Sequence, residues 1–210
     1  MPERTYGLVG DNTTRAMRLD SSTHALEIID YAHHEIHGGS SFTAHYTITT
    51  AATSGHRSGL YIKTPSTASG KKIHLIVEFS ASTAADFSIC EAPTIAANTG
   101  SHAVAIYNRK RDSTKTATVT DNATSPAANK VTTLSEAQIA GDGTWATGTI
   151  IRTAPLTAGA GPKPAGGSSR GSQEYILKAA TAYVFLITNT AASANAHHIL
   201  IDWYEHTDKD

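Results

Sequence analysis

The chain of 210 residues contains a single cysteine, Cys90, so an internal disulfide is impossible. Because Cys90 ends the apolar stretch FSIC, we interpret it as a buried thiol. Charge is scarce as well: charged residues make up 17% of the chain, and the formal net charge is −1. Such a balance gives no field that would attract nucleic acid or an anionic membrane surface.

Long hydrophobic runs are also missing, since no apolar stretch approaches the roughly 20 residues that span a bilayer. The first residues, MPERTY, lack the basic region and apolar stretch of a secretory signal. We therefore expect a soluble protein made in a cytoplasm. The length suits one all-β domain, or one domain with arms, and allows a core without help from metal or disulfide.

Short apolar segments, many of them alternating, recur between breaks rich in Gly, Pro, Asn, Asp and Ser. These are typical of strands, which we expect at 24–31, 42–49, 59–63, 72–80, 87–91, 104–109, 116–120, 148–153, 174–177, 182–188 and 198–204. Residues 133–139 alone suggest a helical turn, because they begin as a capping box. The pattern predicts an all-β, antiparallel β-sandwich of jelly-roll-like type.

The chain divides into an irregular start and a single β-sandwich domain. Residues 1–24 show no sustained period and are predicted to form an N-terminal arm or edge segment, with the domain at 25–210. Two loop excursions are predicted at about 120–147 and 154–172, where turn-forming residues dominate. A loop as long as the second is usually functional, so we expect it to become ordered against a neighbouring subunit.

The eleven histidines raise the question of a metal site. On a strand, His33, Glu35 and His37 would project from one face, which is a ligand spacing of metal-binding β-barrels and cupins. The distant ligand that a cupin needs has no recognisable context here, although His74, His198 and His206 are available. We therefore expect no resident metal and no cofactor, with these imidazoles bonding backbone groups at a sheet edge or subunit contact.

Other catalytic patterns are missing. No Gly-x-Ser-x-Gly elbow accompanies the many serines, and the glycines at 159–171 form no phosphate-binding loop because the required Gly-Lys-Ser/Thr and helix are lacking. Arg109, Lys110 and Arg111 form a basic cluster at a predicted hairpin end, suited to carboxylates of a partner. We expect no catalytic residues and no enzymatic activity.

Two short segments frame the β pattern: YAHHEIHGGSSF at 31–42 and HHILIDWYEH at 197–206. The combination H-x-E-I-H-x-G-x-x-F before a first core strand, with W-Y-E-H closing the last, resembles the β-sandwich capsid decoration (cement) proteins of tailed bacteriophages. In the closing strand, Trp203 and Tyr204 are expected to point to opposite faces, one into the core and one to a surface.

The resemblance implies a structural virion protein that decorates and stabilises the outside of a phage capsid by binding across major capsid protein subunits. It also implies self-association, with a trimer favoured, and neither nucleic acid nor membrane as a partner. The side chains that we expect at interfaces are polar, basic or aromatic: Arg4, Tyr6, Arg15, Arg18, His34, His37, Arg109, Lys110, Arg111, Lys163, Arg170, Tyr204 and His206.

Two alternatives remain open from the sequence. The chain could be a phage tail, fibre or head-spike component that binds a host receptor, since Thr-rich strands fit that function equally well. From another class, it could be a cupin-like metal-dependent enzyme built on His33, Glu35 and His37.

Overall fold

The computed structural model describes residues 6–8, 14–16, 31–51, 54–95, 102–121, 128–134, 139, 147–156, 163–166 and 174–207. The chain divides into two compact units, residues 1–34 and 35–210. In the first unit, β1 (Tyr6–Leu8) pairs antiparallel with β2 (Thr14–Ala16). Helix α1 (Tyr31–Gly38) spans the boundary between the units. None of the helices in the described residues is long and apolar enough to cross a membrane.

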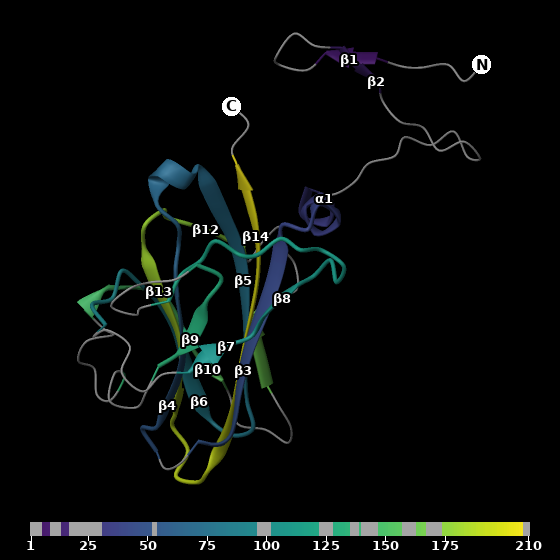
Figure 1. The fold of residues 1–210 in the computed structure, drawn as a ribbon. Helices are drawn as coiled ribbons and strands as arrows, with labels where there is room; N and C mark the ends of the chain where they lie inside the picture. The colour runs from purple at the N-terminus through teal and green to yellow at the C-terminus, as the bar shows by residue number, and fades with distance from the viewer. Residues whose placement is uncertain are drawn as a thin grey trace, which may run out of the picture. The chain divides into compact units, whose positions relative to one another are not determined.

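The second unit consists of two antiparallel sheets that face each other (Figure 1). The first, which we call the β13 sheet, has the order β10 (Thr149–Leu156), β6 (Ala85–Glu91), β13 (Ala182–Asn189), β4 (Arg57–Lys63), β9 (Val131–Thr133) and β7 (Ala103–Val104).

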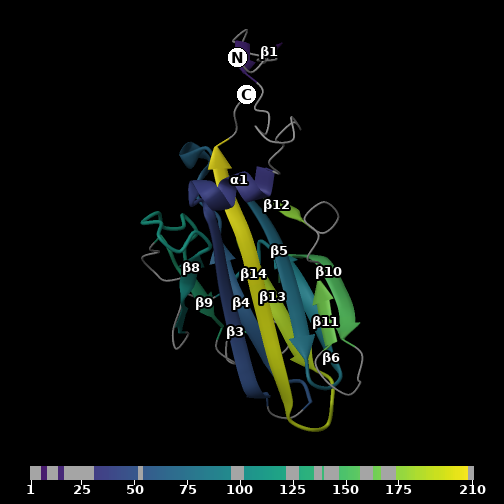
Figure 2. The same cartoon turned by 90° about the vertical axis from the view of Figure 1, so that its right-hand side faces the viewer.

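The other sheet, which we call the β14 sheet, turns its outer face to the viewer in Figure 2. Its order is β11 (Lys163–Gly166), β5 (Lys71–Ala81), β14 (Asn195–Thr207), β3 (Ser41–Ala51) and β8 (Ile106–Asn108), with β12 (Tyr175–Leu177) also pairing β5. A short 3-10 helix, η1 (Thr67–Ser69), precedes β5. The all-β antiparallel sandwich predicted from the strand pattern is confirmed.

The core lies between the sheets and follows the alternation of the strands. Along β5 every second residue from Ile73 to Ala81 is buried, and Phe79 meets Phe87 of β6 across the sandwich, with ring centroids 4.5 Å apart. Each large apolar side chain buried in this way contributes roughly 1.5–3 kcal/mol. Because the two inner faces share one core, the sandwich forms a stable frame for its loops.

A second apolar cluster covers the outer face of the β13 sheet. It consists of Tyr61, Cys90, Leu134, Ile139, Val184 and Leu186. This explains why β13 is apolar almost throughout rather than alternating, since both of its faces are buried. Cys90 belongs to this cluster and is fully buried, as predicted.

Most strand predictions are confirmed, namely those at 42–49, 59–63, 72–80, 87–91, 148–153, 174–177, 182–188 and 198–204. The segment 104–109 is wrong as one strand, because the chain crosses at Ala105 from β7 in one sheet to β8 in the other. Strands β9 and β11 were not predicted, and β11 pairs with β5 inside the segment 154–172 that was interpreted as a loop. Residues 24–30 and 135–138 lie outside the described residues.

Candidate interaction site at one end of the sandwich

The two segments that frame the sequence meet in space. Phe42 in β3 is the register partner of Trp203 in β14, and their ring centroids are 5.7 Å apart. The Glu205 backbone N–H donates to the Ser40 carbonyl at 2.9 Å. Residues some 160 positions apart in the sequence therefore build one end of the sandwich. We call this end the motif junction and define it by Glu35, Gly39, Phe42, Trp203 and Glu205.

Helix α1 ends in the motif junction through a Schellman cap. Gly39 has φ +72°, its N–H donates to the Ile36 carbonyl at 3.0 Å, and the Ser40 N–H donates to the Glu35 carbonyl at 2.9 Å. The Gly38-Gly39 pair in the sequence is the signal for this helix end. The segment that the metal hypothesis would place on a strand is therefore a helix.

The helix also separates the three residues of the metal hypothesis. Successive residues turn by about 100° on a helix, so Glu35 points away from the side shared by His33 and His37. Glu35 is buried, whereas both histidines are exposed. The strand geometry that would bring the three side chains together does not exist. Within the described parts of the chain, no group of three or more His, Cys, Asp or Glu side chains is placed to hold a metal ion.

Asn108 at the end of β8 holds the loop of residues 109–115, which we call the basic loop. Its side-chain amide donates to the carbonyl of Gly39 at 2.8 Å and to that of Lys115 at 3.0 Å, which ties both ends of the loop to the motif junction. The Arg109 N–H donates to the Ser41 carbonyl at 2.9 Å. The cationic side chains of the loop are all exposed: Arg109, Lys110, Arg111 and Lys115.

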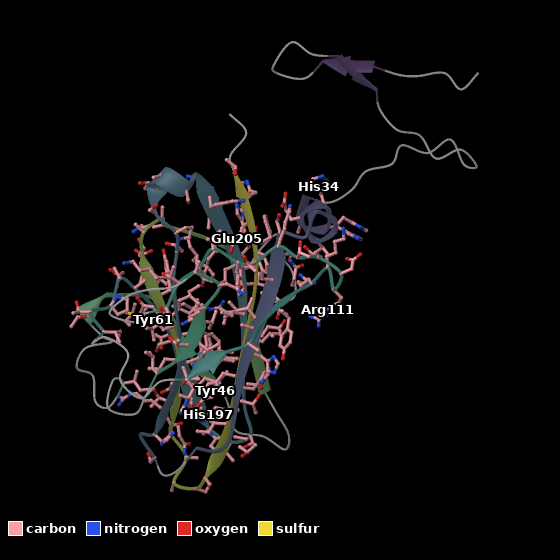
Figure 3. The ribbon with its side chains drawn as sticks, in the orientation of Figure 1. His34, Tyr46, Tyr61, Arg111, His197 and Glu205 are labelled. Carbon is pink, nitrogen blue, oxygen red and sulfur yellow. The ribbon has the colours of Figure 1, made fainter. Side chains whose placement is uncertain are left out.

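Glu205 is a buried carboxylate that serves as an acceptor for the neighbouring segment. It accepts from the Thr118 N–H at 2.9 Å, the Thr118 hydroxyl at 2.7 Å and the Trp203 indole N–H at 3.1 Å. With 3% of its surface exposed, the carboxylate depends on these charge-assisted bonds to offset its burial. In Figure 3 Glu205 lies within this end of the sandwich, while Arg111 lies on the outside.

The segment 116–120 is not the strand that its alternation predicted. Ala117 and Val119 do face the core, but the segment has no strand ladder. It closes the end of the sandwich, bonded to Glu205 on the β14 sheet and by a single bridge from Thr120 to Lys63 on the β13 sheet. The alternating burial of residues 116–120 is therefore that of a segment that crosses the end of the core from one sheet to the other.

Two grooves flank residues 114–116. One, of about 270 Å³, is lined by side chains that include Phe42, Tyr107, Arg111 and Lys115. The other, of about 350 Å³, includes Lys71, Lys115 and Glu205. The lining of the first groove thus combines apolar side chains, hydroxyl groups and two cations, whereas the carboxylate of the second groove already accepts hydrogen bonds from Thr118 and Trp203.

Tyr204 points to the outer face of the β14 sheet, opposite to Trp203 as predicted, yet it is only 5% exposed. The His74 ring stacks on it at 4.6 Å, and its hydroxyl donates to Glu174 Oε2 at 3.3 Å. His206 Nε2 lies 2.9 Å from His74 Nε2. These side chains form a cluster of their own on the sheet face, separate from the basic loop.

The predicted interface residues are thus spread over several elements. Arg109, Lys110 and Arg111 come together in the basic loop, Tyr204 and His206 share the outer-face cluster, and His34 and His37 are exposed on α1. Tyr6, Arg15 and Lys163 lie in β1, β2 and β11, where only the backbone is described. Outside the described residues lie Arg4, Arg18 and Arg170.

Sequence reasoning missed Asn108, Gly39 and Glu205 as positioning residues. Gly39 and Glu205 belong to the two framing segments, so the sequence marked them, but it did not show which contacts they make. Asn108 carried no signal, because its importance comes only from the contacts that its amide makes.

Comparison of the chain with models of protein families and with curated proteins finds no match.

Proposed function

We propose that this protein is a structural component of a tailed-phage virion that binds and stabilises the outside of the capsid. The observation that supports the proposal is the motif junction. The two segments that resemble the decoration-protein pattern meet through Phe42 and Trp203 and anchor an exposed basic loop. The two parts of the pattern, far apart in the sequence, thus lie in contact in the folded chain.

A decoration protein needs a stable frame that presents contacts at fixed positions. The sandwich supplies the frame through its shared core, and Asn108 and Gly39 hold the basic loop to the end of β3 and β8. A protein that binds the assembled shell but not its separate subunits shifts the equilibrium toward the assembled state by mass action. Stabilisation of a capsid follows from binding alone and requires no catalytic chemistry.

The proposal is tested with heads of the encoding phage that lack this protein. Purified full-length chain is mixed with these heads, and binding is measured by co-sedimentation, followed by cryo-electron microscopy of the pelleted particles. We expect saturable binding, regular density on the outer shell and an increase in the temperature at which the heads disrupt. Density confined to the tail or to a single vertex, or no binding to the heads, would overturn the proposal.

A further inference from the structure

The groove beside the basic loop is lined by two exposed cations. Arg111 and Lys115 both line it and both are exposed. Neither takes part in an ion pair within the described part of the chain. The one acidic residue of the loop, Asp112, is exposed and does not line the groove. This small surface therefore carries positive charge although the chain as a whole is close to neutral.

Arg111 is also held in a defined place. Its guanidinium lies over the Tyr107 ring, 5.3 Å from the centroid, and its Nη1 donates to the Asn108 carbonyl at 3.5 Å. A guanidinium stacked in this way loses less freedom when it binds a carboxylate, and its planar edge suits bidentate contact. The Tyr107 ring, 40% exposed, adds an apolar surface beside the charge.

We propose that this groove binds an acidic peptide segment of a protein partner, with Arg111 and Lys115 as the contacts to its carboxylates. Backbone and side chains of the peptide would lie along the Thr114 and Thr116 hydroxyls and the rim of Tyr107. A nucleic acid fits less well, because nucleic-acid interfaces are larger and far more strongly positive than this two-cation groove. The inference rests on the proposed function for where the partner comes from: the segment belongs to the capsid surface.

The test uses the full-length chain and a fluorescein-labelled peptide of ten glutamates, with binding measured by fluorescence anisotropy at low and at physiological salt. The variant Arg111→Gln/Lys115→Gln removes the two proposed contacts. The matched control Arg152→Gln/Lys178→Gln removes the same number of charges from β10 and from the residues after β12, outside both grooves. Circular dichroism confirms that each variant is folded.

We expect the groove variant to weaken peptide binding about tenfold, because both carboxylate contacts are lost, and the control to leave it within about twofold. Affinity should fall as salt rises. Equal losses in the two variants would show a non-specific charge effect and overturn the proposal. So would tighter binding of a labelled ten-residue oligothymidylate than of the peptide, or no binding of the peptide at low salt.

The same variants on phage heads separate this inference from the proposed function. If wild-type protein binds heads and the groove variant binds them equally well, decoration stands and the groove proposal fails. If the peptide binds in the groove but the heads do not bind the protein, the groove proposal stands and the decoration proposal fails.

Discussion

Acidification should destabilise this protein through one buried histidine, His197 (Figure 3). The imidazole is 1% exposed on the inner face of β14; its Nδ1 lies 2.9 Å from the Ser58 hydroxyl, and its Nε2 has no hydrogen-bond partner in the described structure. Burial, reinforced by repulsion from His56, lowers the pKa of His197 to about 4. The folded state therefore holds this ring neutral.

The sign and the size of the effect follow from that lowered pKa. An unfolded histidine titrates near pH 6.5, so as pH falls from about 6.5 to about 4 the unfolded state takes up a proton that the folded state does not. Stability is full above this window and declines within it by about 1.4 kcal/mol per pH unit. We expect a loss of about 2 kcal/mol at pH 5 and about 3 kcal/mol near pH 4 from this residue.

The assay is urea unfolding, followed by circular dichroism, at several pH values from 7.5 to 4.5. His197→Asn removes the titrating ring while leaving an amide near Ser58, so its free energy of unfolding should depend less on pH than that of the wild type. Ser58→Ala should lower stability by about 1 kcal/mol at every pH and keep the wild-type slope. An equal pH dependence of His197→Asn and the wild type between pH 6.5 and 4.5 would show that His197 is not the titrating group.

Three further predictions concern single positions. In thermal unfolding, Gly39→Ala should lower the stability by over 1 kcal/mol more than Gly55→Ala does. Both glycines have a positive φ, but only a Cβ at Gly39 would collide with Ser113. Equal losses of stability would contradict the close approach of the basic loop to Gly39. In urea unfolding, Glu205→Gln should lower the free energy of unfolding by about 1–3 kcal/mol, and Glu205→Ala by about 3–5 kcal/mol, because alanine leaves several buried donors unsatisfied. If both variants are nearly as stable as the wild type, the carboxylate does not hold the segment 116–120. Burial raises the pKa of Cys90, so its thiol should react with a disulfide reagent only after denaturant is added, and rapid labelling of the native protein would count against the buried position.

The fold class and most strands could be predicted from the sequence. A strand with one buried face alternates between apolar and polar residues, as β3 and β5 do, and a strand with two buried faces is apolar almost throughout, as β13 is. Both patterns can be read from neighbouring residues in the sequence. The same local logic placed Cys90 in the core and Trp203 opposite Tyr204. It did not predict helix α1, although the Gly38-Gly39 pair is a signal for the end of a helix.

The contact between the two framing segments could be seen only in the folded protein. Phe42 and Trp203 become neighbours because β3 and β14 pair at the centre of one sheet, and pairing between distant strands depends on the whole topology rather than on local pattern. For the same reason the crossing at 116–120 resembled a strand, since its hydrogen bonds go to Glu205, which is remote in the sequence. Local sequence records which side of a segment is buried, whereas the partner that satisfies its polar groups is chosen only when the chain is folded.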